Sequence, residues 1–138
     1  MKRGWRQFLL GSFLGLFAVL GAHGSAAAAE LVMFERSGCA WCMRWDLEVA
    51  PGYERSDEGR IAPLRRVSLD NGQPRDLPLA APVRFTPTFV LIDRGREVGR
   101  ITGYMDEATF WGLLGTMIER LGNNPGRATA GAAAPGRP

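Results

Sequence analysis

The sequence holds two cysteines, Cys39 and Cys42, within the stretch RSGCAWCMRWD. Two thiols separated by two residues can do three kinds of chemistry. They can close a small structural disulfide, bind a metal ion through sulfur, or alternate between dithiol and disulfide while passing two electrons to a partner. Two features of the sequence bear on which of these three kinds of chemistry applies. They are the ligands available elsewhere in the chain and the elements that flank the pair.

A structural disulfide would contribute little stability here, because closing a loop of about four residues removes little entropy from the unfolded chain. Structural zinc needs four cysteine or histidine ligands, and the only histidine, His23, lies in an N-terminal segment that we expect to be removed. Monovalent copper stays open as an alternative, because soft sulfur ligands suit that ion. Its further ligand would be a methionine, and the candidates are Met33, Met43 and Met105.

The position of the pair favours electron transfer. Cys39 stands where a strand-like segment gives way to a helix-like one, so unpaired N–H groups and the helix dipole would favour its thiolate. Cys42 lies one helical turn further on, where it is less exposed and close enough to attack a mixed disulfide. We therefore predict that Cys39 is the nucleophile, that Cys42 is the resolving thiol, and that no bound cofactor is needed.

A strand and a helix are predicted on the two sides of the motif. The run LVMFE, residues 31–35, is short and apolar, as a buried strand is. From Cys39 onward the apolar spacing becomes that of one helical face, whose members are Trp41, Trp45 and Val49 with Cys42 on the adjoining row. Pro51-Gly52 is expected to end this helix.

The next segments predict the rest of a sheet. Residues 64–69 end with alternating apolar and polar side chains, as a half-buried strand does. Three prolines within residues 71–82 argue against a regular helix there. Residues 85–93 are strand-like, and Arg94-Gly95 makes a tight turn into the run REVGRIT, which predicts an antiparallel hairpin.

The end of the domain predicts an amphipathic helix. Asp106 is a suitable N-cap, and Gly122 lies past the expected end. The apolar residues follow the series i, i+3, i+4, i+7, i+8, i+11 and are Phe110, Leu113, Leu114, Met117, Ile118 and Leu121. The order is strand, helix, strand, hairpin and helix, and a right-handed crossover makes the first two strands parallel. This order predicts an α/β fold with a mixed sheet flanked by helices.

A proline at position 87, just inside a strand-like run, conflicts with a strand because it has no N–H for the ladder. Together with Cys-X-X-Cys at a strand-to-helix junction, Thr86-Pro87 resembles the cis-proline loop of the thioredoxin superfamily, which lies against the active-site cysteines. The resemblance implies a cis bond before Pro87. It also implies that the backbone N–H and C=O of Thr86 pair with an extended substrate strand.

The resemblance covers nearly the whole domain, in a reduced thioredoxin-like order of β-α-β followed by β-β-α. Several segments are similar to the small periplasmic thioredoxins of bacterial sulfur-oxidation (Sox) gene clusters, namely LVMFERSGCAWCMRWDLEVAPGY, EGRIAPLRRV, RFTPTFVLIDRGREVGRITGY and FWGLL. That similarity implies a thiol-disulfide oxidoreductase that reduces disulfides or sulfur adducts on periplasmic proteins, notably the sulfur-carrier protein. An inner-membrane thiol transporter would supply its electrons. The alternative direction is an oxidant that donates its disulfide to folding proteins.

The sequence departs from ordinary thioredoxin near the motif. The first strand and helix of that fold have no counterpart, Gly38 replaces the tryptophan before the first cysteine, and Met33 replaces the buried aspartate. Glu35 shares the strand parity of Met33 and lies nearer the motif, so it is a candidate proton acceptor for Cys42. The other interpretation is a solvated carboxylate at the strand end. We expect the Trp41 ring to be exposed at the substrate groove, with a core position as the alternative.

The ends of the chain predict export. Three cationic residues precede an apolar run over residues 8–20 and a small-residue stretch, which is the layout of a secretory signal peptide over residues 1–29. The alternative is an uncleaved membrane anchor, against which counts that an apolar run of about 13 residues is shorter than the roughly 20 that a spanning helix needs. Cleavage after Ala28 or Ala29 would release the protein into the periplasm.

Between the predicted signal peptide and a disordered tail, residues 122–138, lies one domain at residues 30–121. This domain has 12 arginines against 14 aspartates and glutamates, so no basic stripe remains for nucleic acid. No separate dimerisation domain is visible, and we expect a monomer.

Overall fold

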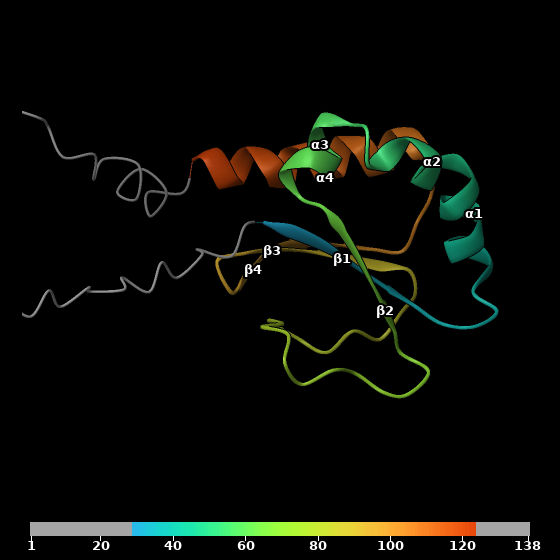
Figure 1. Ribbon diagram of the computed structural model, residues 1–138. Coiled ribbons are helices and arrows are strands. Elements are labelled where there is room, and N and C mark those ends of the chain that lie inside the picture. The colour runs from blue at the N-terminus through green and yellow to red at the C-terminus, as the bar shows by residue number, and fades with distance from the viewer. Residues whose placement is uncertain (1–28, 124–138) are drawn as a thin grey trace, which may run out of the picture.

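The computed structural model describes residues 29–123, and within this range four strands form one mixed sheet in the order β2-β1-β3-β4 (Figure 1). The strands are β1 (Glu30–Glu35), β2 (Leu64–Ser68), β3 (Thr88–Asp93) and β4 (Arg96–Thr102). β1 pairs in parallel with β2 and antiparallel with β3, and β3 pairs antiparallel with β4. The predicted crossover and hairpin are therefore confirmed.

The helices of the described range lie on one side of this sheet (Figure 1). They are α1 (Ala40–Glu48), α2 (Ala50–Tyr53), α3 (Asp57–Ile61) and α4 (Glu107–Gly122). Asp106 caps α4 as predicted, since its carboxylate accepts a hydrogen bond from the N–H of Thr109 at 2.8 Å. Within residues 29–123, no helix has the length and apolar character needed to cross a bilayer.

Aromatic side chains fill the space between the helices and the sheet. The ring of Trp45, fully buried, lies 5.2 Å from that of Phe89 and 5.6 Å from that of Phe110, measured between centroids. These contacts join α1 to β3 and α4, and Cys42 belongs to the same core cluster. The core thus fixes the helix that carries the cysteine pair.

The opposite face of the sheet is covered by the long segment between β2 and β3, which runs beneath the strands in Figure 1. Val32, Phe34 and Val90 of the sheet pack there with Leu69 and Val83 of that segment. As predicted, the three prolines are not in a helix. A loop therefore supplies the apolar cover that a helix supplies on the other face.

Two element boundaries on the helix side differ from the prediction. Pro51-Gly52 does not end the helical path, because α1 ends at Glu48 and Pro51 lies in the first turn of α2, where a missing N–H costs nothing. α3 was not predicted, and its N-cap Ser56 accepts a hydrogen bond from the N–H of Gly59 at 2.9 Å.

Two further boundaries shift by a few residues. β3 begins at Thr88 instead of residue 85, because Pro87 has no N–H to give to the ladder. α4 includes Gly122, which was expected past its end. The predicted signal peptide and tail lie outside the described residues, apart from Ala29, Gly122 and Asn123.

Candidate active site

Three loops meet at one end of the sheet. Thr88, the first residue of β3, pairs with Phe34 near the end of β1 and with Thr102 at the end of β4. The N–H of Gly103 then donates to the carbonyl oxygen of Pro87 at 2.7 Å. Three segments therefore leave the sheet at this same end: the turn before α1, the segment around Pro87 and the loop after β4.

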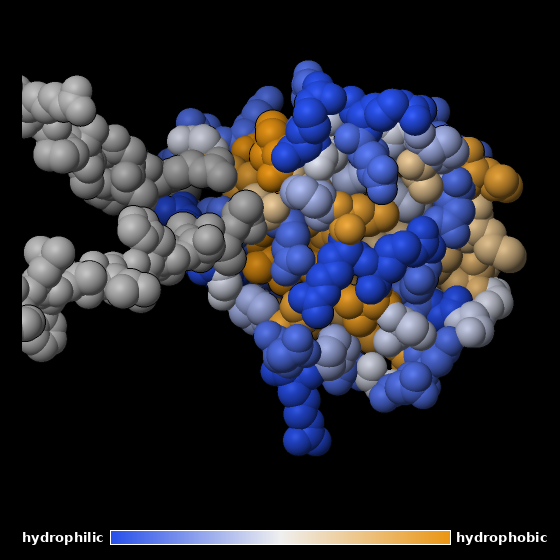
Figure 2. All heavy atoms as spheres, in the orientation of Figure 1, coloured by the Kyte–Doolittle hydropathy of each residue, from blue (hydrophilic) through white to orange (hydrophobic). Residues whose placement is uncertain are grey.

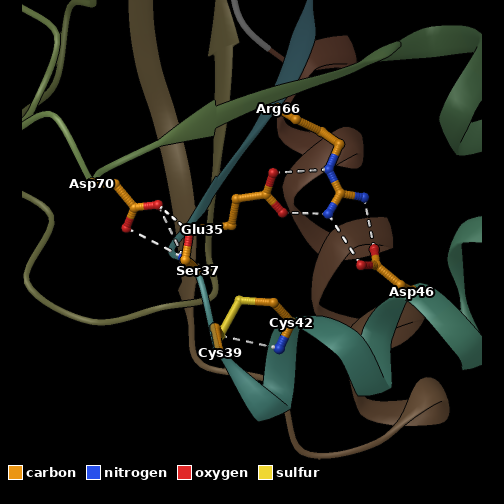
Figure 3. Close-up of polar contacts among 7 residues, drawn as sticks. All are labelled: Glu35, Ser37, Cys39, Cys42, Asp46, Arg66 and Asp70. Atoms are coloured by element: carbon orange, nitrogen blue, oxygen red, sulfur yellow. Dashed lines mark hydrogen bonds and ion pairs between the residues drawn. A yellow bond between two sulfur atoms is a disulfide. The ribbon is translucent and has the colours of Figure 1, made fainter.

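Cys39 is the N-cap of α1, as its place in the sequence predicts. Its backbone is extended, and its Sγ accepts a hydrogen bond from the N–H of Cys42 at 3.2 Å (Figure 3). The two sulfurs form a disulfide, with Cα atoms 5.2 Å apart. Cys39 is half-buried, whereas Cys42 is only 4% exposed. The more accessible cysteine thus lies where N–H donors favour a thiolate.

The turn that leads into α1 is tied to the end of β2. Asp70 accepts hydrogen bonds from the N–H of Ser37 at 3.1 Å and from its hydroxyl at 2.5 Å (Figure 3). The Ser37 hydroxyl is the main reason why the pKa of Asp70 lies below its usual value. Gly38 follows with a φ of +73°, a conformation that glycine adopts without steric cost. Its lack of a side chain suits the turn that presents Cys39.

Glu35 lies on the sheet face that α1 covers, in an ion pair with Arg66 of β2. Figure 3 shows the guanidinium of Arg66 between two carboxylates, those of Glu35 and Asp46, the second at 2.6 Å. The hydrogen bonds that Arg66 donates to Glu35 first and to Asp46 second raise the pKa of Arg66, so the group stays charged. Glu35 could be singled out from the sequence, whereas its partner Arg66, 31 positions away, could not.

If Glu35 accepts the proton of Cys42, replacing Glu35 with Gln should slow disulfide reduction near neutral pH by roughly 10²-fold and move the pH profile to higher pH. The reason is that Cys42 would then have to lose its proton to solvent. The measurement is the turnover rate with a protein disulfide between about pH 5 and 9. Asp46→Asn is the matched control, because it also removes a carboxylate from Arg66. An unchanged pH profile in Glu35→Gln would show that Glu35 forms the ion pair with Arg66 but does not accept the proton of Cys42.

The segment before β3 carries the second predicted signature. The peptide bond between Thr86 and Pro87 is cis, the isomer that the resemblance implies. Pro87 is buried and Thr86 half-buried, while the hydroxyl of Thr88 donates to the carbonyl of Phe85 at 2.8 Å. The Phe85 side chain is 68% exposed at this edge. A role of Thr86 and Pro87 in substrate binding remains a prediction.

Trp41 is not buried as Trp45 and Val49 are, since this residue is 52% exposed. This is the exposed position expected for it. Figure 2 shows further apolar surface over α1, where Met43 and Leu47 are exposed. The guanidinium carbon of Arg44 lies 5.6 Å from the centre of the Trp41 ring, a contact that was not predicted.

The three methionines considered for copper lie in different settings. Met33 is fully buried in the helix-side core, and Met43 is exposed on α1. Met105 is exposed beside a pocket that Ile101, Phe110 and Leu113 help to line. Within residues 29–123, no group of three or more histidine, cysteine, aspartate or glutamate side chains could hold a metal ion.

A family of thioredoxin-like domains matches residues 22–118. The chain belongs to this thioredoxin-like family. Its Cys39–Cys42 pair, on this fold, makes it a thiol-disulfide oxidoreductase, and the predicted fold class is confirmed. No curated protein sequence matches the chain.

Among solved structures, this thioredoxin-like chain is similar to the periplasmic thioredoxin SoxS from Paracoccus pantotrophus in its reduced form. The two are 47% identical, with a TM-score of 0.64, over 67% of this chain and 98% of that one. A thioredoxin from Malassezia sympodialis is 17% identical, with a TM-score of 0.50, over 65% of this chain and 75% of that one, and supports the fold alone. The resemblance stated from the sequence is therefore confirmed.

Proposed function

We propose that the protein is an exported reductase of the periplasm that restores thiols on partner proteins through Cys39 and Cys42. The observation that carries this proposal is the 47% identity to a periplasmic thioredoxin over nearly all of that protein's length. The predicted signal peptide at residues 1–29 supports the same compartment. The partner that we expect is a cysteine-bearing sulfur carrier. The resemblance to the periplasmic thioredoxins of sulfur-oxidation (Sox) gene clusters implies this partner, and the similarity to the thioredoxin SoxS supports that resemblance.

The cycle consists of two thiol-disulfide exchanges. The thiolate of Cys39 attacks one sulfur of the partner disulfide, a mixed disulfide forms, and the partner's other sulfur leaves as a thiolate. The thiolate of Cys42 then attacks Sγ of Cys39, so the partner's second sulfur leaves and the Cys39–Cys42 disulfide closes. Two electrons pass to the partner. An inner-membrane thiol transporter then acts as the dithiol donor and returns two electrons to the Cys39–Cys42 disulfide.

Burial of Cys42 supports this division of roles. A sulfur of the partner can reach Cys39, which is half-buried. Cys42 is only 4% exposed, so its contact is with Cys39 and not with the partner. The 5.2 Å between the Cα atoms lets the second exchange proceed without moving the helix, because that separation lies in the usual range for a disulfide.

Replacing Cys42 with Ser should trap the partner on Cys39 as a stable mixed disulfide, because the second exchange cannot occur. The trapped protein is identified by mass spectrometry of cell extracts quenched with acid. The double variant Cys39→Ser/Cys42→Ser is the matched control and should trap nothing. Capture of one cysteine-bearing sulfur carrier supports the proposed partner, whereas capture of many unrelated secreted proteins would assign a general housekeeping role.

The direction of electron flow is tested separately. A reductant should have a potential near that of thioredoxin, about −270 mV, and should be mainly dithiol in intact cells. An oxidant that donates its disulfide would have a potential nearer about −120 mV and would be mainly disulfide. Alkylation of intact cells, followed by separation of the two forms by mass, distinguishes these outcomes.

A further inference from the structure

A charged residue lies beside the exposed ring between the two cysteines. The guanidinium carbon of Arg44 lies 5.6 Å from the centre of the Trp41 ring and 6.0 Å from that of Tyr104. Guanidinium groups at such distances are attracted to aromatic rings. Arg44 therefore lies near both a ring of the active-site helix and a ring of the loop after β4.

Glu48 forms an ion pair with Arg44. Its carboxylate accepts a hydrogen bond from Nε of Arg44 at 2.8 Å and another from the hydroxyl of Tyr104 at 2.5 Å. The hydrogen bonds from Tyr104 and then Arg44 lower the pKa of Glu48, while burial and then Glu48 raise that of Tyr104. At neutral pH the carboxylate is thus charged and the phenol is a neutral donor.

Tyr104 anchors the chain of contacts in the core. It is buried, belongs to the helix-side core cluster, and its ring lies 6.4 Å from that of Phe110. The preceding residue, Gly103, donates to the carbonyl of Pro87. The contacts therefore run from the loop beside Pro87 through Tyr104, Glu48 and Arg44 to Trp41.

We propose that Arg44 is a positioning residue that holds the Trp41 ring ready for the partner's disulfide segment, and that Glu48 and Tyr104 hold Arg44. An exposed side chain loses rotamer freedom when a partner covers it, and this loss weakens binding. A ring that is already held loses less. This proposal rests on the proposed reductase function in one respect: its test measures the binding of a protein disulfide as substrate.

The alternative role for Arg44 is an electrostatic effect on the cysteines themselves. A cation two residues after Cys42 could stabilise a thiolate and so change the reduction potential. That role would not depend on the Trp41 ring. The two roles are therefore separated by whether the effect of Arg44 disappears when Trp41 is absent.

The test measures the KM and kcat for reduction of insulin, with dithiothreitol as the electron donor. Arg44→Ala should raise KM about three- to ten-fold with kcat little changed, and Arg44→Lys should give an intermediate KM. In a Trp41→Ala background, Arg44→Ala should change KM no further. Arg60→Ala is the matched control, because Arg60 is an exposed arginine on α3 paired with Asp57, and it should leave both constants unchanged.

A second measurement needs no partner. The fluorescence anisotropy decay of Trp41, obtained as the difference from Trp41→Phe, should show faster local motion of the ring in Arg44→Ala. Unchanged motion, or an undiminished effect of Arg44→Ala in the Trp41→Ala background, would overturn the proposal. Failure of the unmodified protein to reduce insulin would instead contradict the reductase function, and the anisotropy would still decide the role of Arg44.

Discussion

Replacing Cys39 with Ser should lower the rate of disulfide reduction by roughly 10³-fold or more, to the background given by the reductant alone. Serine keeps the size of the side chain, but its hydroxyl is not ionised at neutral pH. It therefore cannot attack a disulfide sulfur even with the N–H groups of the α1 start directed at it. Turnover with insulin measures the effect.

The matched comparison is Cys42→Ser, which has the same chemical change one helical turn away. It should lose turnover but keep the first exchange, and so form one equivalent of mixed disulfide with a small aromatic disulfide. Circular dichroism should show the same helix content in both variants. Turnover by Cys39→Ser, or a mixed disulfide formed on Cys42 in that variant, would reverse the assigned roles.

Replacing Gly59 with Ala should destabilise the protein by about 1–3 kcal/mol. A Cβ at this position of α3 would lie 1.9 Å from the carbonyl oxygen of Tyr53, a backbone atom that cannot turn aside. Tyr53 is itself fixed, since it is buried and its hydroxyl donates to the carbonyl of Ala62 at 2.8 Å. The backbone of the α2–α3 connection would have to move.

The control for this prediction is Gly112→Ala in α4, where a Cβ would meet nothing within 4 Å. There the same substitution should stabilise the protein by about 0.5–1 kcal/mol, because alanine has the higher helix propensity. Urea unfolding of the oxidised protein measures both changes. Effects of the same sign in the two variants would contradict this account of the glycines.

The order of the elements and the position of the motif could be predicted from the sequence because both depend on local patterns. The change of apolar spacing at Cys39 is visible within a few residues, and Cys39 is indeed the N-cap of α1. The apolar series of the last helix and its cap Asp106 are equally local. These features required no knowledge of which segments meet in space.

The polar partners around the motif could not be predicted in this way. Three side-chain hydrogen bonds join residues that lie far apart in the sequence. They are Ser37 with Asp70, 33 positions apart, Glu35 with Arg66, 31 apart, and Glu48 with Tyr104, 56 apart. Each pair depends on strand register or on how a helix packs against a loop, and nothing in the local pattern specifies either. The apolar period likewise grouped Trp41 with Trp45, although only Trp45 is buried.

Signals for the missed helices are present but short. Ser56 followed by two acidic residues, Asp57 and Glu58, is a usual helix start, yet the helix that follows has only five residues. The predicted effect of Pro51 was wrong because a proline ends a helix only when it falls in the interior, and here it falls in a first turn.

The proposed cycle requires that the sulfur of Cys39 be held as a reactive thiolate at the start of α1. The direct measurement is the rate of iodoacetamide alkylation of each cysteine in the reduced protein between about pH 4 and 10, resolved by mass spectrometry of peptides. We expect Cys39 to react before Cys42, and we expect the rate for Cys39 to reach half of its maximum well below the value for free cysteine, about pH 8.5. A half-maximum for Cys39 at or above that value would show that the start of α1 does not hold this sulfur as a thiolate.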